Sequence, residues 1–162
     1  MKAQEFLDKE HYLSFSSKTQ KKELKGLLLK GNSYSVNFKI LEGDLDISDY
    51  SELRNNLGLE CIDAHYNKIV ANLNIFSHLV KLKHLSLGTT EKGSPNVWNY
   101  NDFHGSLKSL ENCHNLEYLC IGQQTQIISG LEYLPLEKLI YFGCHGTVFQ
   151  DMLKPFDYDI LS

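Results

Sequence analysis

The fold of this chain is decided by the stretch Leu59-Glu60-Cys61-Ile62-Asp63-Ala64-His65-Tyr66-Asn67-Lys68-Ile69. It places apolar side chains at its first, fourth and sixth positions and an asparagine at its ninth. A template that recurs in order along a chain indicates stacked structural repeats, so its recurrence predicts a solenoid. It occurs four more times, as Leu24-x-x-Leu27-x-Leu29-x-x-Asn32, Leu82-x-x-Leu85-x-Leu87-x-x-Thr90, Leu116-x-x-Leu119-x-Ile121-x-x-Gln124 and Leu136-x-x-Leu139-x-Tyr141-x-x-Cys144.

Each copy of the template predicts a short strand followed by a bend. The fourth and sixth positions alternate with exposed ones, as in a strand that buries one face. The ninth side chain is expected to turn inward and to hydrogen-bond the backbone of the bend. Asn32, Asn67 and Cys144 suit that role, whereas Thr90 and Gln124 fit it less well and predict looser bends.

Two of the four intervals between copies are longer than the 20 to 29 residues usual for such a repeat. For the first, from Leu24 to Leu59, we favour an extra degenerate coil through 41–47, where apolar and polar residues alternate. The second, from Leu82 to Leu116, contains a polar, turn-rich stretch with two aromatic residues, Trp98 and Tyr100. Such composition is typical of a loop, which we expect to protrude over about residues 89–102.

The segments between the strands supply a second layer. Apolar residues recur every third position from Leu73 to Leu82 and from Leu107 to Leu116, which suits short or 3₁₀ helices. We expect an amphipathic capping helix within residues 1–22, the solenoid over 23–146 and a C-terminal cap over 147–162, because the end coils of a solenoid otherwise expose their core.

The repeated template resembles that of the leucine-rich-repeat proteins, most completely at 59–69. The stretches at 3–9, 41–49 and 129–135 are more narrowly similar to the irregular leucine-rich repeats abundant in root-symbiotic fungi, some of which are attached to kinase domains. The resemblance implies an α/β solenoid with a parallel sheet on its concave side, short helices on its convex side and a role in protein recognition. It names no ligand.

Composition and charge exclude several other classes of function. A net charge of −4 offers no general attraction to nucleic acid or to anionic lipid, and no apolar run reaches the length of a membrane span. If Met1 is the native start, the lack of a signal peptide predicts a cytoplasmic protein with reduced cysteines. The four cysteines form no C-x-x-C pair and no phosphate-binding glycine loop occurs, so we expect neither cofactor nor structural metal.

The variable strand positions predict which side chains a partner would meet. Cys61, Asp63, His65 and His84 should be close neighbours there, which allows a metal site or a cysteine nucleophile with His84 as base. We favour the simpler interpretation, a mixed polar and aromatic surface for protein binding, because a catalyst also needs a pocket that excludes water. The predicted concave binding face comprises Cys61, Asp63, His65, His84, Ser86, Tyr118, Cys120, Lys138, Ile140 and Phe142, with Trp98 and Tyr100 as a loop contact.

The sequence therefore predicts a non-enzymatic module that binds a protein or peptide on its concave face. Two alternatives stay open. The coils could be a structural segment of a larger receptor or kinase, or could self-associate into a homo-oligomer through the solenoid ends. More remotely, Cys61 and His84 could form a cysteine enzyme.

Overall fold

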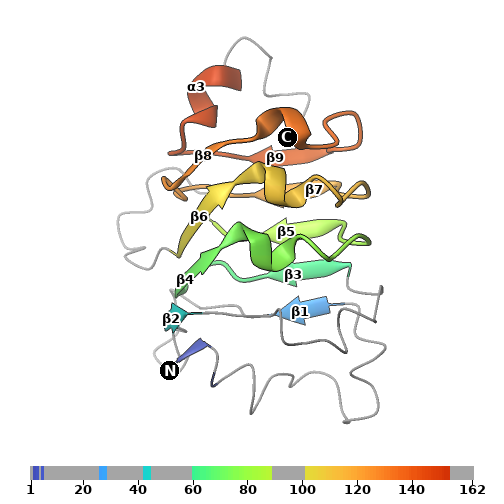
Figure 1. Ribbon diagram of the computed structural model, residues 1–162. Coiled ribbons are helices and arrows are strands. Elements are labelled where there is room, and N and C mark those ends of the chain that lie inside the picture. The colour runs from blue at the N-terminus through green and yellow to red at the C-terminus, as the bar shows by residue number, and fades with distance from the viewer. Residues whose placement is uncertain are drawn as a thin grey trace.

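The computed structural model describes residues 2, 3, 5, 26–28, 42–44, 60–88 and 101–153. Two parallel sheets run side by side along the molecule, with short helices beside them (Figure 1). Within these residues no helix is long and apolar enough to cross a membrane.

The first sheet contains one strand from each copy of the template. Its order is β1-β3-β5-β7-β9, every neighbouring pair is parallel, and the strands succeed one another up the molecule (Figure 1). This is the parallel sheet that the resemblance to leucine-rich-repeat proteins implied. Its strands are β1 (Gly26–Leu28), β3 (Cys61–Asp63), β5 (His84–Ser86), β7 (Tyr118–Cys120) and β9 (Tyr141–Gly143).

A second parallel sheet, in the order β2-β4-β6-β8, was not predicted. A local signal for it exists at Lys68–Asn72, where exposed and buried residues alternate along the chain. The register of β6 against β8 shifts at Gly105, which has a positive φ of 107°. The strands are β2 (Glu42–Asp44), β4 (Lys68–Asn72), β6 (Asp102–Ser106) and β8 (Ile127–Ser129).

In the described residues three 3₁₀ helices follow strands of the second sheet, and the three-residue apolar spacing predicted the first two of them. They are η2 (Leu73–Phe76), η3 (Leu107–Leu110) and η4 (Leu131–Tyr133), and successive ones pack against each other. Side chains cap the N-termini of η2 and η3. The Asn72 side chain accepts from the backbone N of Asn74, and the Ser106 side chain accepts from the backbone N of Lys108. Such caps satisfy backbone donors that a short helix leaves free.

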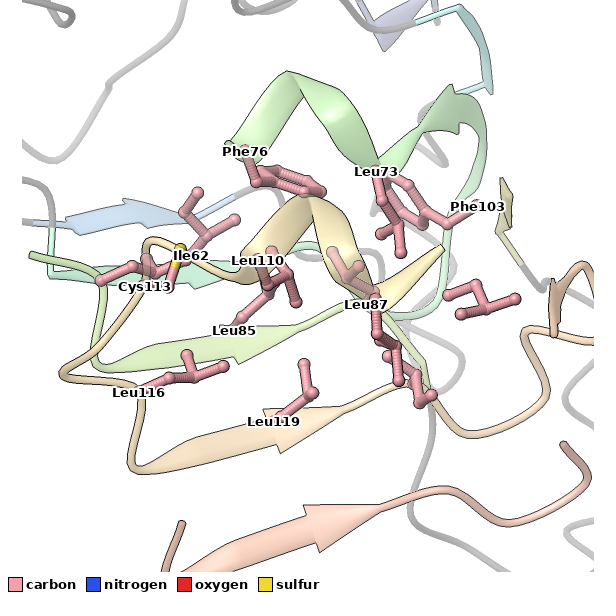
Figure 2. Close-up of a cluster of buried hydrophobic side chains, with 14 of the residues drawn as sticks. Ile62, Leu73, Phe76, Leu85, Leu87, Phe103, Leu110, Cys113, Leu116 and Leu119 are labelled. Carbon is pink, nitrogen blue, oxygen red and sulfur yellow. The ribbon is translucent and has the colours of Figure 1, made fainter. Parts of the chain in front are cut away.

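The core lies between the sheets and the 3₁₀ helices, and each coil contributes the same kind of side chain to it (Figure 2). The template leucines of the third and fourth coils, such as Leu85 and Leu119, are fully buried. Phe103 fills the space beside η2, where its ring centroid lies 5.8 Å from that of Phe76. Cys113 is also fully buried, as expected for a free cysteine that packs as a small apolar residue.

Both long intervals are single coils in the first sheet. β1 pairs directly with β3 and β5 directly with β7, so no further strand of that sheet lies between them. The extra coil expected in the first interval is therefore wrong: residues 42–44 form β2 of the second sheet and pair with β4. The predicted loop at 89–102 lies outside the described residues except for its last two, Asn101, which is buried, and Asp102, which begins β6.

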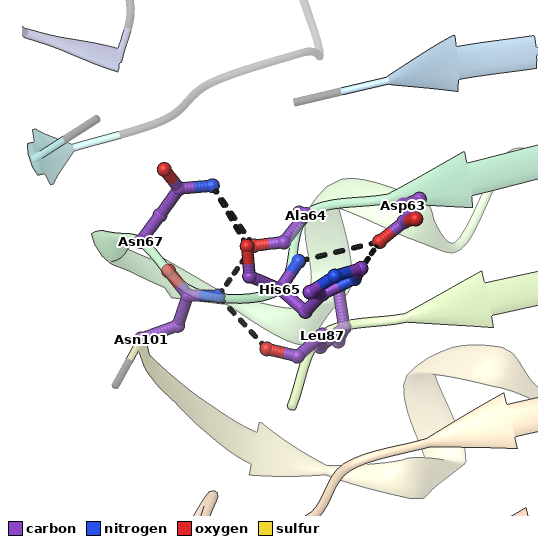
Figure 3. A network of polar contacts seen from close by, with 6 residues as sticks. All are labelled: Asp63, Ala64, His65, Asn67, Leu87 and Asn101. Carbon is purple, nitrogen blue, oxygen red and sulfur yellow. Dashed lines mark hydrogen bonds and ion pairs between the residues drawn. The ribbon is translucent and has the colours of Figure 1, made fainter. Parts of the chain in front are cut away.

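The inward-facing polar residues form a ladder between neighbouring coils (Figure 3). The predicted role of Asn67 is confirmed: it is fully buried, and its Nδ2 donates to the carbonyl oxygen of Ala64 at 3.1 Å. In the next coil Asn101 takes this role, and the predicted position, Thr90, lies outside the described residues. Asn101 Nδ2 donates to Ala64 O at 2.7 Å and to Leu87 O at 2.8 Å, and its Oδ1 accepts from Ile69 N at 2.9 Å.

The ladder continues through the side-chain oxygen of Gln124, whereas its buried Nε2 has no hydrogen-bond partner among the described residues. Gln124 is 1% exposed, and its Oε1 accepts from Phe103 N at 2.9 Å, which repeats the contact between Asn101 and Ile69 one coil earlier. In the last coil Thr147 Oγ1 donates to the carbonyl of Cys144 at 2.6 Å. Side-chain bonds of the ladder thus reach the bends after β3, β5 and β9.

Only small parts of the two predicted caps lie within the described residues. At the C-terminus α3 (Phe149–Leu153) buries Phe149, whose ring centroid lies 6.4 Å from that of Phe142. At the N-terminus Ala3 is buried in the core and Ala3 and Glu5 are helical. The remainder of the predicted N-terminal helix and residues 154–162 lie outside the described residues.

Candidate functional site

The register of the first sheet places its variable residues in straight rows across the strands. One row runs Gly26, Cys61, His84, Tyr118 and Tyr141, because each of these residues is paired with the next. A second row contains Asp63, Ser86, Cys120 and Gly143. Both rows lie on the outer face of the sheet, opposite the side chains of the core.

Three aromatic side chains of the first row form a continuous stack, which we call the ring column: His84, Tyr118 and Tyr141. The His84 and Tyr118 ring centroids are 4.1 Å apart with their planes 6° from parallel. The Tyr118 and Tyr141 centroids are 4.5 Å apart with an angle of 12°. The spacing matches that of parallel strands, so the sheet itself holds the rings in contact.

Small residues in the second row make room for these rings. A Cβ atom on Gly143 would lie 2.9 Å from Cε1 and Oη of Tyr141 and 3.1 Å from Sγ of Cys120, so the Tyr141 phenol leans across this row. Ser86 and Cys120 are correspondingly buried. Burial, with the nearby Cys120 thiol, raises the pKa values of both Tyr118 and Tyr141, so both phenols are neutral at physiological pH.

Asp63 and His65 form a polar pair at the β3 end of the same face (Figure 3). His65 Nδ1 contacts Asp63 Oδ1, and the backbone N of His65 donates to the same oxygen at 3.4 Å. Burial lowers the pKa of His84, while Asp63 acts in the opposite direction and His65 in the same direction. The predicted proximity of Asp63, His65 and His84 is therefore what the structure shows.

Three of the predicted face residues lie outside the two rows, because the fifth copy of the template begins later than predicted. The sequence predicts that this copy begins at Leu136, but the strand that pairs with β7 requires it to begin at Leu139, three residues later. Phe142 is consequently a core residue with 6% exposure and contacts Phe149. Lys138 and Ile140 are exposed, but both precede β9 and lie outside the two rows.

Tyr141 is the face residue that sequence reasoning missed. A signal was present, because Leu139-x-x-Phe142-x-Cys144-x-x-Thr147 also fits the template and follows Leu116 by the same interval that separates Leu59 from Leu82. In this frame Cys144 takes the buried sixth position and Thr147 the ninth. The remaining predicted contacts, Trp98 and Tyr100, lie outside the described residues.

The cysteines of the described region have the properties of structural thiols. Burial, with a contribution from Asp63, raises the pKa of Cys61, whereas a cysteine nucleophile needs a lowered one. Burial also raises the pKa of Cys120, and that of Cys113 to about 12. Among the residues that the structure describes, no three His, Cys, Asp or Glu side chains come together as metal ligands.

Comparison with known proteins identifies the fold. The structure is similar to the crystal structure of the leucine-rich-repeat ectodomain of the receptor kinase SOBIR1 from Arabidopsis thaliana, with a TM-score of 0.52 and 22% sequence identity. The match covers 78% of this chain and 58% of that ectodomain. No protein-family model matches the chain, and no curated protein sequence matches it significantly. The fold is therefore a leucine-rich-repeat solenoid.

Proposed function

We propose that this chain is a protein-interaction module that binds a protein or peptide on the outer face of its first sheet, centred on the ring column. The observation that carries the proposal is the stack of His84, Tyr118 and Tyr141, which the sheet register holds in place before any partner arrives. Tyrosine is enriched among the residues that dominate binding energy. A preformed stack loses little side-chain freedom on binding, so more of the contact energy appears as affinity.

The surroundings of the ring column support the same use. Ser86, Cys120 and Gly143 lie beside the rings and the Asp63–His65 pair lies at one end, so apolar area and polar groups occur on one surface. This mixture is typical of protein interfaces. The fold supports a binding role as well, since repeat solenoids present an extended sheet surface. A second contact through the loop that contains Trp98 and Tyr100 stays a prediction.

Removing the two tyrosines tests the proposal. Partners captured from native extract are identified by mass spectrometry and then titrated in purified form against the wild type and the double variant Tyr118→Ala/Tyr141→Ala. We expect at least about a tenfold loss of affinity, since hot-spot aromatics each contribute about 2 kcal/mol or more.

The matched control is Tyr133→Ala, which removes an exposed tyrosine from η4, away from the first sheet. It should bind like the wild type, and thermal unfolding of all variants should show that they remain folded. Equal affinity of the double variant and the wild type would place the binding site elsewhere.

Self-association is a second candidate, which the C-terminal coils favour. Four large apolar side chains there are at least half exposed: Ile128, Leu136, Ile140 and Met152. Sedimentation velocity over a hundredfold concentration range tests this candidate. A dimer that Ile140→Asp and Met152→Asp dissociate would support it, whereas a monomer at every concentration would exclude it.

A further inference from the structure

The ring column ends abruptly at β3. The row that supplies the rings continues from His84 to Cys61 on β3 and to Gly26 on β1, and neither residue carries a ring. The face of His84 that does not contact Tyr118 therefore lies toward a thiol and a glycine. A planar group placed above Cys61 would continue the stack at the spacing of His84 and Tyr118, whose ring centroids are 4.1 Å apart. We call this position, above Cys61 and beside the open face of His84, the step.

One carboxylate, that of Asp63, lies beside this position without a lysine or arginine partner among the described residues. Asp63 follows two residues after Cys61 on the same strand, and it lies close enough to influence the protonation of both Cys61 and His84. Its two contacts with His65 both use Oδ1, so among the described residues Oδ2 is left to accept from a further donor. Glu60 adjoins Cys61 on the other side, and the ammonium group of Lys83 neutralises it at 2.9 Å.

A ligand group that fits this step must be planar, to lie on the imidazole, and cationic, to pair with the carboxylate. The arginine guanidinium meets both conditions, because it stacks on aromatic faces and donates hydrogen bonds in its own plane to carboxylates. A lysine ammonium supplies the charge without the plane, and an aromatic ring supplies the plane without the charge.

We infer that the step above Cys61 is a subsite for an arginine side chain of the protein partner, with the guanidinium stacked on His84 and hydrogen-bonded to Asp63. The inference rests on the proposed function and names the partner class for that surface: a segment that contains arginine and continues along the ring column. Cys61 is required to be small, and His84 must present a free face.

Small probes test the subsite separately from the protein partner. N-acetylarginine methylamide is titrated into the full chain and followed by ¹H–¹⁵N NMR, beside the citrulline and lysine analogues. Citrulline keeps the plane and lacks the charge, whereas lysine keeps the charge and lacks the plane. We expect saturable shifts centred on Cys61, Asp63 and His84 for arginine, with affinities at least about fivefold weaker for the other two.

Two variants complete the test. Cys61→Phe should fill the step with a ring of the protein itself and abolish the arginine shifts, and Asp63→Asn should weaken them by about tenfold or more. The control is Tyr133→Ala, which lies on η4 away from the first sheet and should bind arginine like the wild type. Thermal unfolding checks that each variant is folded.

Several outcomes would overturn the inference. They are equal binding of lysine or citrulline, shifts that map away from β3 and β5, persistence of arginine binding in Cys61→Phe, and no arginine binding at all. If a purified partner still loses affinity with Tyr118→Ala/Tyr141→Ala in any of these cases, the proposed function stands and only the arginine subsite fails. If arginine binds at the step but the tyrosines do not affect the partner, the proposed function fails.

Discussion

The imidazole of His84 lies flat against the phenol of Tyr118, with ring centroids 4.1 Å apart and ring planes 6° from parallel. The contact joins two residues 34 positions apart in the sequence, and it exists because β5 and β7 pair with these residues opposite each other. It is the centre of the proposed binding surface, and burial of His84 there lowers the pKa of its imidazole.

Acidification should destabilise the protein through His84. Burial lowers the pKa of His84 in the folded chain below its ordinary value of 6.5, so the unfolded chain binds the proton first as the pH falls. The stability that this histidine contributes is complete above 6.5 and is lost as the pH falls through the folded pKa. His84→Phe keeps a ring without a proton and should therefore lose less stability between about pH 7.5 and about pH 5, measured by urea unfolding. Tyr118→Phe keeps every histidine and should retain the wild-type slope; equal slopes for all three proteins would contradict the assignment.

Asn101→Ala should strongly destabilise the solenoid. The change removes the partner of two buried backbone groups, the carbonyl of Leu87 and the N–H of Ile69. The carbonyl of Ala64 loses one of its two donors and keeps its bond from Asn67. Each unpartnered group costs about 1–3 kcal/mol, so we expect a loss of at least about 2 kcal/mol in the free energy of unfolding, measured in urea. The control is Asn115→Ala, whose exposed amide donates to Val80 O at 3.4 Å and should cost less than about 0.5 kcal/mol. Similar losses for the two variants would show that Asn101 is dispensable.

Two glycine-to-alanine changes in the first sheet should differ in their effects. A Cβ on Gly88 would lie 2.0 Å from the carbonyl oxygen of Gly122, and backbone cannot move aside cheaply, so we expect a loss above about 3 kcal/mol or failure to fold. A Cβ on Gly143 meets mainly the side chain of Tyr141, at 2.9 Å, which can rotate away. Gly143→Ala should cost about 1 kcal/mol and alter the near-UV circular dichroism of the tyrosines. Equal destabilisation in urea would refute this distinction.

The four cysteines should react with iodoacetamide at rates set by burial. Cys61 is the most exposed of them, but its raised pKa should make it slower than the same thiol in the unfolded chain. Cys113, Cys120 and Cys144 are buried and should be modified only as the protein unfolds. Mass spectrometry of peptides from timed reactions, with and without urea, measures the rates. A thiol that reacts faster in the native protein than in urea would restore the cysteine-enzyme hypothesis.

The sequence by itself determined the features that depend on neighbours within one coil. The alternation at Leu59–Asn67 was sufficient for a strand and an inward asparagine, because side-chain direction and the bond from Asn67 to Ala64 are set within a few residues. The spacing of apolar residues likewise predicted η2 and η3. The surface formed by Asp63, His65 and His84 followed from aligning successive copies of the template.

The tertiary structure alone decided the features that depend on which segment lies alongside. Near the C-terminus the template fits the sequence in two frames, one that begins at Leu136 and one that begins at Leu139. The structure has the second frame, which places Phe142 against Phe149 in the core. The same frame places Tyr141 opposite Tyr118 in the sheet. Asn101 is a ladder residue because the chain returns there to the preceding coil, so its side chain reaches the carbonyl of Ala64. The ring column arises the same way. Its stacking comes from strands paired across long loops, and no stretch of sequence contains that pairing.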